Sequence, residues 1–295
     1  MKWRGRQGSS NVEDQRGGRG SRGRMGGLRI GGKSLGCGSL IVIIILVMLG
    51  VDPMALLQSG AIDTTVQTEQ PQPYEAQSQE EADLAQFVSV VLKDTEDVWN
   101  TIFRDQLGRQ YVEPTLVIFD FQVKSACGMA SSATGPFYCP GDQKLYIDLS
   151  FYRELSQKFG APGDFAMAYV VAHEVAHHVQ NLLGYTSKVS SQRGRVSETD
   201  YNQLSVRLEL QADFLAGVWA HHADQTKRIL EEGDVEEAIS CANAIGDDRI
   251  QKQARGYVVP DSFTHGTSEQ RVRWFKKGIQ TGNISQGDTF NTRNL

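Results

Sequence analysis

Apolar residues after residue 80 recur mainly three or four positions apart, which is the spacing of amphipathic helices. Helices of this kind are expected over residues 81 to about 107, 163–184, 201 to about 230, 234 to about 255, and after residue 267. Two shorter apolar stretches, residues 115–120 and 143–149, predict strands. The pattern therefore predicts a mainly helical α+β domain over residues 81–295, with a small β-sheet or hairpin.

A different pattern precedes this domain. Residues 35–51 are nearly all apolar, and residues 35–57 together are long enough to cross a bilayer. We expect a transmembrane signal anchor over residues 35–57, with a cleaved signal peptide and a buried core helix as the alternatives. Residues 58–80 show no apolar period and are rich in Gln, Thr, Pro and Glu, which predicts a flexible linker.

The charge of the chain is divided between its two ends. Residues 1–33 hold nine basic and two acidic residues, a net +7 that leaves −12 for the rest, because the whole chain carries −5. Rich in Gly and Arg and poor in apolar residues, residues 1–34 are expected to form a disordered cytoplasmic head. Basic residues before the apolar segment and acid after it place the N-terminus in the cytoplasm and the domain in the periplasm or outside the cell. We expect the arginines to serve this orientation and expect no nucleic-acid partner.

The cysteines fit an exported domain. Cys127 and Cys139 flank a short segment containing Gly, Ser and Pro, and their spacing admits a disulfide in an oxidising compartment. Neither belongs to a Cys-x-x-Cys pair, which argues against a second zinc site.

The residues with the clearest chemistry lie in the helix predicted over residues 163–184. His173 and His177 are four positions apart, so both imidazoles project from one face and can share a Zn²⁺ ion. Glu174 lies about 100° around the helix from His173, which suits a general base better than a ligand. Such a spacing can arise by accident in a charged helix. Here the neighbouring residues are apolar, and buried imidazoles without a partner are costly, so the motif predicts a metal site.

A catalytic zinc site has three protein ligands and one open position, so a third ligand is needed. The next long helix carries Glu209 and Asp213, four positions apart within an apolar stretch. We predict Glu209 as the ligand and Asp213 as the hydrogen-bond partner of a ligating histidine. The alternative is a solvated acidic edge. The other histidines considered as ligands and judged less suitable are His178, His221, His222 and His265.

His-Glu-x-x-His followed by Glu-x-x-Ala-Asp resembles the gluzincin metallopeptidases of the HtpX and CAAX-prenyl-protease type. The chain is more closely similar to the YpfJ-type neutral zinc metallopeptidases, a family of bacterial membrane-anchored proteins. The similar segments are residues 1–6, 11–14, 135–140, 146–152, 172–180, 209–213 and 264–271. The resemblance implies a zincin-like, minigluzincin-type fold, His173, His177 and Glu209 as zinc ligands, and Glu174 as the catalytic base.

His265 has two interpretations. HtpX-like enzymes carry a His-Pro step followed by an arginine near the reaction centre, whereas this chain has Gly266 in place of the Pro. His265 could donate a hydrogen bond to the oxyanion of the tetrahedral intermediate, or it could cap the last helix. Both interpretations stay open at this point.

The sequence thus predicts a membrane-anchored zinc endopeptidase that acts on proteins or peptides through a water activated by Zn²⁺. Alternation of Leu145, Ile147 and Leu149 predicts a half-exposed strand, which could receive the substrate backbone at the sheet edge or simply cover the core. The alternative function is a membrane-anchored binding or scaffold protein whose zinc site is structural or vestigial.

Overall fold

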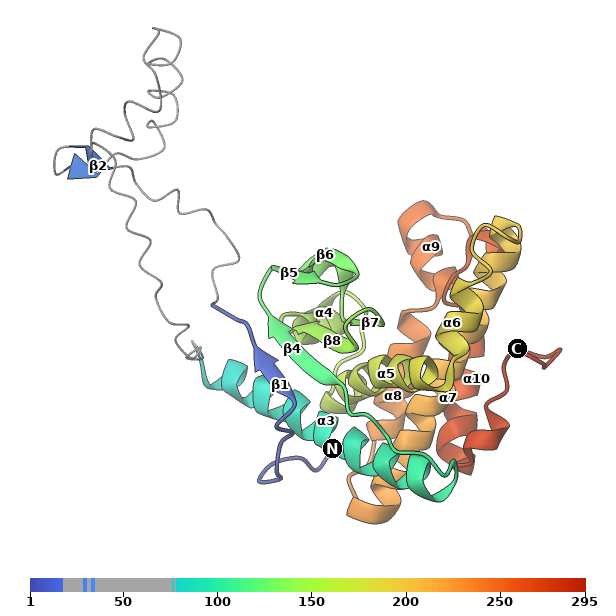
Figure 1. The fold of residues 1–295 in the computed structure, drawn as a ribbon, viewed down its shortest axis with the longest axis horizontal. Coiled ribbons are helices and arrows are strands. Elements are labelled where there is room, and N and C mark those ends of the chain that lie inside the picture. Colours follow the sequence, from blue (N-terminus) through green and yellow to red (C-terminus); the bar gives the residue numbers. More distant parts are fainter. Residues whose placement is uncertain (18–28, 31–32, 35–75, 77) are drawn as a thin grey trace, which may run out of the picture. The chain divides into compact units, whose positions relative to one another are not determined.

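The computed structural model describes residues 1–17, 29–30, 33–34, 76 and 78–295 (Figure 1). The chain divides into two compact units, one formed by Met1–Arg16 and Glu75–Leu295 and the other by Gly17–Tyr74. In the second unit the structure describes β2 (Arg29–Ile30) and β3 (Lys33–Ser34), which pair antiparallel. The first unit holds the other helices and strands that the structure describes.

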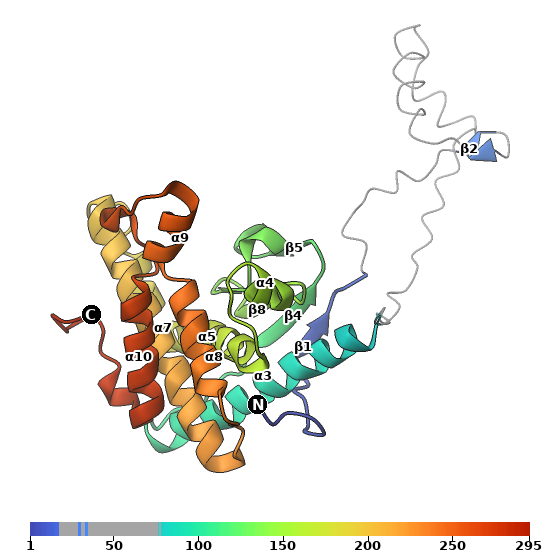
Figure 2. The ribbon, with the colours of Figure 1, turned by 180° about the vertical axis from the view of Figure 1, so that it is seen from behind.

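The first unit contains a small sheet and a group of packed helices. Its helices are α3 (Gln79–Asp105), α4 (Phe151–Gln157), α5 (Asp164–Leu183), α6 (Tyr185–Ser190), α7 (Glu198–Lys227), α8 (Asp234–Ala244), α9 (Asp247–Arg255) and α10 (Ser268–Thr281). Short 3₁₀ turns lie at Ser132–Thr134, Pro260–Ser262 and Ile284–Gln286. Figures 1 and 2 show the sheet on one side of α5 and α7, α8 and α10 on the other. The expected mainly helical α+β architecture is confirmed for this unit.

The sheet has the strand order β1-β4-β8-β7. Its strands are β1 (Val12–Asp14), β4 (Thr115–Phe119), β8 (Lys144–Asp148) and β7 (Phe137–Cys139), and a separate hairpin joins β5 (Gln122–Ser125) to β6 (Gly128–Ser131). β1 and β8 run parallel to β4, whereas β7 runs antiparallel to β8. The strand predicted over residues 143–149 is present, but the expected half-exposure is wrong, because β8 is buried from Leu145 to Asp148. The interpretation that this strand receives the substrate at the sheet edge is also wrong, because β7 occupies that edge, whereas the alternative, a strand that covers the core, agrees with the structure. The polar Asp148 is accommodated there by accepting hydrogen bonds from the backbone N–H groups of Phe121 and Ser150.

The expected helix over residues 234 to about 255 is two helices in the structure. The chain turns at Gly246 between α8 and α9, where it passes close to the start of α10. A Cβ atom at Gly246 would lie 2.4 Å from the backbone nitrogen of Ser268, and Asp247 N–H donates to Gly266 O at 2.9 Å. This close passage breaks the helix and holds the segment that carries His265 against the start of α9.

Helices α7 and α10 cross at unusually short range. Gly217 and Gly278 face each other at the crossing, and a Cβ atom added to either would lie 2.3 or 2.0 Å from a backbone oxygen of the other helix. Only glycine permits this approach. The contact places Asp213, one turn before Gly217, beside Arg271 of α10.

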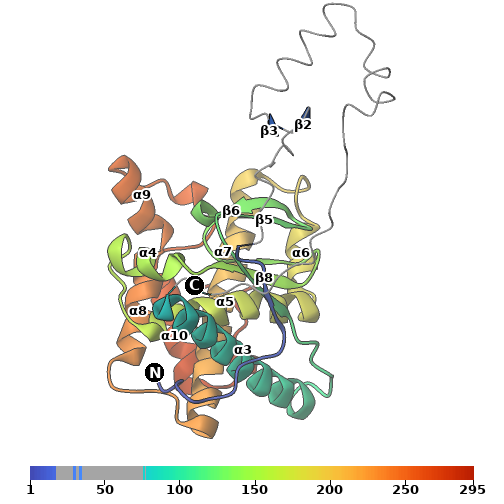
Figure 3. The same cartoon turned by 90° about the vertical axis from the view of Figure 1, so that its left-hand side faces the viewer.

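Residues 1–16 belong to the folded unit, so the prediction that residues 1–34 are disordered is wrong for this part of them. β1 pairs with β4, and Figure 3 shows the N-terminal segment running beside α3. The basic side chains of the segment form ion pairs with acidic residues, including Arg6 with Asp94 and Arg16 with Glu81. The Met1 amino group lies 2.6 Å from an Asp164 carboxylate oxygen. Composition alone predicted disorder because it could not show that the charges of this segment have partners on α3 and at the start of α5.

The predicted transmembrane anchor, residues 35–57, lies outside the described residues, as does nearly all of the predicted linker. None of the helices that the structure describes combines the length and apolar character needed to cross a membrane. The first long helix begins slightly earlier than expected, because Ser78 caps α3 by accepting a hydrogen bond from Glu81 N–H.

Cys127 and Cys139 form a disulfide that ties the turn between β5 and β6 to the end of β7. Closing a loop of this size restricts the unfolded chain and is worth about 2–4 kcal/mol. We expect Cys127→Ser to lower the free energy of unfolding by this amount in urea titrations. A reducing agent should destabilise the wild type similarly and leave the variant unchanged. A wild-type unfolding curve that does not respond to reduction would contradict this role.

Candidate metal centre

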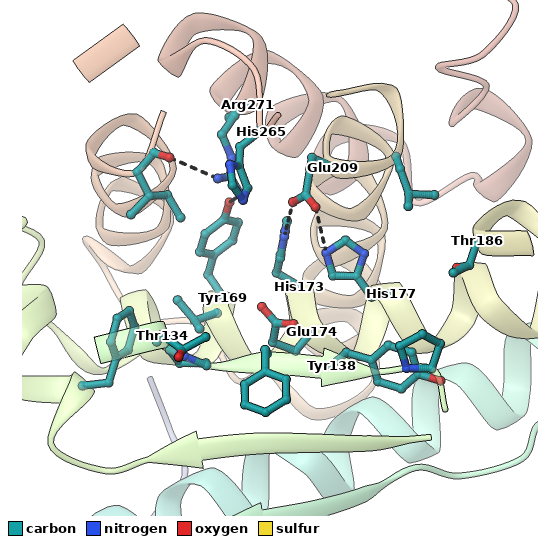
Figure 4. A pocket seen from close by; sticks show the side chains of 18 of the residues that line it. Thr134, Tyr138, Tyr169, His173, Glu174, His177, Thr186, Glu209, His265 and Arg271 are labelled. Carbon is teal, nitrogen blue, oxygen red and sulfur yellow. Dashed lines mark hydrogen bonds and ion pairs between the residues drawn. The ribbon is translucent and has the colours of Figure 1, made fainter. Parts of the chain in front are cut away.

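Helix α5 carries the His-Glu-x-x-His motif through the middle of the domain. It is buried along most of its length, and Gly184 ends it in a left-handed conformation, with φ 84°. His173 and His177 project from one face, with ring centroids 4.8 Å apart. Their Nε2 atoms point toward α7, as Figure 4 shows.

Glu209 of α7 faces both rings. One carboxylate oxygen, Oε2, lies 3.2 Å from His173 Nε2, and the other, Oε1, lies 3.5 Å from His177 Nε2. Two atoms bound to one tetrahedral Zn²⁺ at about 2.0–2.1 Å are about 3.3 Å apart. The distances within this triad are therefore those expected between ligands of one zinc ion.

The donor set also suits zinc chemically. One ligand atom from each of His173, His177 and Glu209 can be chosen so that all lie within 4.8 Å of one another. Burial would raise the pKa of the Glu209 carboxyl, but the two imidazoles lower it well below its ordinary value, so the group is kept as the anion that a metal requires. The alternative of a solvated acidic edge is not what the structure shows, since Glu209 turns inward to the two histidines.

Asp213 lies one turn after Glu209 on α7 and contacts His173 on the side away from Glu209. Its Oδ1 lies 2.8 Å from His173 Nδ1, so it faces the ring nitrogen that points away from Glu209. Burial would raise the pKa of Asp213, but Arg271 and His173 lower it below its ordinary value. A carboxylate in this place fixes the orientation and tautomer of the histidine.

Arg271 and Tyr169 complete this support, and neither was predicted as a site residue. Arg271 donates two hydrogen bonds of 2.9 Å to the Asp213 carboxylate, and the Tyr169 hydroxyl donates to the same group. The available signal for Tyr169 was its position four residues before His173. Arg271 is the last residue of the segment 264–271 that resembles the family, but nothing in the sequence indicated that it meets Asp213.

His177 is held by a separate set of bonds. Its Nδ1 lies 2.9 Å from Gln180 Oε1, and the Gln180 side-chain amide in turn donates to Leu208 O and Gln211 Oε1. These bonds connect α5 to α7 next to Glu209. Each imidazole thus has a polar partner at the ring nitrogen that points away from Glu209, and this partner orients the ring.

Glu174 lies beside the triad, next to β7, and does not reach Glu209 as a co-ligand would (Figure 4). Burial raises the pKa of its carboxyl, while His177, His173 and a hydrogen bond from the Tyr138 backbone lower it, and the net shift is upward. A raised pKa brings a carboxylate closer to the range in which it exchanges protons near neutral pH. Its placement fits the predicted general base.

The triad and Glu174 line one cavity of about 500 Å³. Residues of the β7 edge, including Gly135, Phe137 and Tyr138, form one wall, and His265 contributes from the opposite side. Edge strands in this position can pair with an extended peptide. The cavity therefore combines a candidate metal site with a strand edge able to hold a substrate backbone.

His265 points into this cavity but is not part of the triad. Its side chain is 51% exposed, and its Nδ1 lies 3.2 Å from Asp247 Oδ1. The interpretation that His265 caps the last helix is wrong, because Thr267 caps α10 together with Gln270. The other interpretation, hydrogen bonding to an oxyanion, agrees with its position.

The remaining candidate histidines have other partners. His178 is buried, with Tyr138 Oη 3.0 Å from one ring nitrogen and Val112 O 2.6 Å from the other. His221 and His222 contact the backbone oxygens of Ile279 and Gly282. None of the three joins the triad, as expected.

The chain was compared with known proteins. The family described as "Putative neutral zinc metallopeptidase" matches residues 1–290. The uncharacterized protein YpfJ of Escherichia coli K12 is 46% identical over 291 residues, covering 98% of this chain and 99% of the relative. The uncharacterized proteins Mb2605 of Mycobacterium bovis and Rv2575 of Mycobacterium tuberculosis are each 39% identical over 258 residues, covering 84% of this chain and 86% of each relative.

No solved structure matches the chain. The family predicted from the sequence is confirmed over almost the whole length, and the cofactor that it names, zinc, agrees with the triad of His173, His177 and Glu209. The match begins at residue 1, so it includes the N-terminal segment that packs on the domain. The chain belongs to the neutral zinc metallopeptidase family.

Proposed function

We propose that this domain is an endopeptidase that hydrolyses peptide bonds in proteins or peptides. His173, His177 and Glu209 would hold the zinc ion, and Glu174 would act as the general base. The observation that carries this proposal is the placement of one carboxylate from α7 within 3.5 Å of both imidazoles of α5. A zinc ion held by these three residues would lower the pKa of water to about 7 and would polarise a carbonyl group.

The residues of the chain have separate parts in the reaction. Glu174 accepts a proton from the attacking water and passes it to the leaving amine. The free edge of β7 binds the substrate backbone, so that the scissile carbonyl lies between Glu174 and His265. His265 donates a hydrogen bond to the carbonyl oxygen as that oxygen gains negative charge.

The same geometry argues against a binding or scaffold protein with a purely structural metal. Structural zinc sites have four protein ligands, whereas the triad offers three and opens into a cavity. A structural site also has no use for a buried carboxylate beside the ligands, which is where Glu174 lies. The proposal is tested with a casein-type unfolded protein substrate, whose cleavage should stop with a zinc chelator and resume on adding Zn²⁺.

His265→Ala should lower kcat by about 100- to 1,000-fold, because loss of one oxyanion donor has that effect in other hydrolases. KM and zinc content should change little, since His265 is neither a ligand nor on the β7 side of the cavity. Steady-state kinetics and metal analysis of the purified variant test this. An unchanged kcat would remove His265 from the reaction.

The His265–Asp247 pair predicts a pH dependence. The hydrogen bond to Asp247 raises the pKa of His265 above 6.5, and the pKa of Asp247 falls below 3.8 because bonds from His265 outweigh the effect of burial. The pair should therefore stabilise the folded protein fully between pH 3.8 and pH 6.5, where both groups are charged. This stabilisation should be lost as pH rises through the raised pKa of His265, and also as pH falls through the lowered pKa of Asp247. The wild type should exceed His265→Ala in unfolding free energy more at pH 6 than at pH 9. An NMR titration giving His265 a pKa at or below 6.5 would contradict this.

A further inference from the structure

One folded unit is built from two parts of the chain. Along the sequence, the predicted membrane segment separates these two parts. Residues 1–16 pack against residues 78–295 in one compact unit, and residues 35–57 lie between them in the sequence. β1 forms a regular parallel ladder with β4, in which Val12 pairs with Leu116 and Asp14 with Ile118. Beside this ladder, Lys144 Nζ lies 2.7 Å from Glu13 Oε1.

The N-terminal segment also supplies hydrogen-bond and ion-pair partners to two carboxylates that are buried in the domain. Asp94 and Glu96 of α3 are only 1% and 2% exposed. Arg6 pairs with Asp94 in addition to Lys227, and both Ser9 and Asn11 donate hydrogen bonds to Glu96, which also pairs with Lys93. Buried carboxylates that lose such partners are costly. The segment is therefore a structural part of the domain and not an independent tail.

A single membrane crossing between these two parts is incompatible with their contacts. The hydrocarbon core of a bilayer is about 30 Å thick, whereas the Glu13 and Lys144 side chains are in direct contact. A return to the same side by two crossings would need two apolar stretches of about 20 residues each. The sequence between residues 17 and 78 offers one, over residues 35–57.

We propose that residues 1–16 and residues 78–295 lie on the same side of the membrane. This replaces the orientation expected from the sequence, with the N-terminus in the cytoplasm and the domain outside. That expectation rested on the basic residues before the apolar segment. Arg4, Arg6 and Arg16 among them form ion pairs with Asp83, Asp94 and Glu81 of α3. The inference does not depend on the proposed peptidase activity.

The Glu13–Lys144 ion pair permits a direct test in the full chain. A water-soluble carbodiimide activates a carboxylate, and a lysine amine in contact with it then forms an amide with release of the urea. Both side chains are accessible, at 43% and 30% exposure. Cells that produce the protein are broken by freezing and thawing so that the reagent reaches both sides of the membrane, and the cross-linked peptides are identified by mass spectrometry.

We expect a peptide pair joined through Glu13 and Lys144 in the wild type and its loss in Lys144→Arg, which keeps the charge but cannot form the amide. The Lys227–Asp97 ion pair, within residues 78–295, serves as the control for reagent access. Formation of the Lys227–Asp97 link without the Glu13–Lys144 link would overturn the proposal.

A second experiment reads the same arrangement in intact cells. Ser10 and Ser191 are both exposed, and Ser10→Cys and Ser191→Cys can each be treated with a membrane-impermeant maleimide, with the wild type as the background. We expect both positions to be labelled or both to be protected. Labelling of one and protection of the other would place them on opposite sides and overturn the proposal.

Discussion

Glu174→Gln should retain zinc and lose turnover, with kcat reduced by about 100- to 10,000-fold. The substitution preserves the size of the side chain but removes the carboxylate that accepts the proton of the attacking water, and general-base catalysis is worth that factor. Glu174 lies outside the triad, so metal binding should be unaffected. Zinc content, KM and kcat of the purified variant give the three readouts.

Glu154→Gln is a suitable control for this prediction. Glu154 forms an ion pair with Lys158 within one turn and does not line the cavity. Removing the charge of Glu154 in Glu154→Gln should leave kcat unchanged. If Glu174→Gln keeps full activity, the proposed mechanism is wrong even if zinc is present.

Glu209→Ala should abolish activity and lower zinc affinity by more than about 100-fold. This carboxylate faces both imidazoles, and its removal leaves only two protein ligands. Asp213→Asn should have a smaller effect, about 10- to 100-fold, because Asp213 acts through His173 and does not reach the metal position itself. Competition with a zinc chelator of known affinity ranks the two variants.

Glu198→Ala, in the exposed first turn of the same helix, is the matched control and should bind zinc normally. An Asp213 variant that loses more zinc affinity than the Glu209 variant would contradict the assignment of ligand and supporting residue.

The three residues predicted as zinc ligands lie together in the structure, and part of this arrangement follows from local periodicity. His173 and His177 needed only a helix to lie on one face, and the apolar neighbours of Glu209 indicated a second buried helix. The supporting contacts could not be predicted in the same way. Arg271 reaches Asp213 only because Gly217 and Gly278 let α7 and α10 approach closely, and a crossing of two helices leaves no periodic signal.

The errors in the sequence analysis have a common physical cause. Residues 1–16 looked disordered, and residues 143–149 looked half-exposed, because polar residues were taken to face solvent. In the structure the polar groups in question, such as Arg16 and Asp148, are buried against partners far away in the sequence. Polarity of a residue type predicts exposure only when no tertiary partner is present.

The proposed activity depends on one zinc ion held between α5 and α7 by two imidazoles and one carboxylate, with a fourth position open to the cavity. X-ray diffraction from crystals of the protein, recorded on both sides of the zinc absorption edge, tests it most directly. We predict a single anomalous peak about 2.0–2.2 Å from His173 Nε2, His177 Nε2 and a Glu209 carboxylate oxygen. A fully zinc-loaded crystal without a peak at this position, or with a fourth protein side chain bound there, would contradict it.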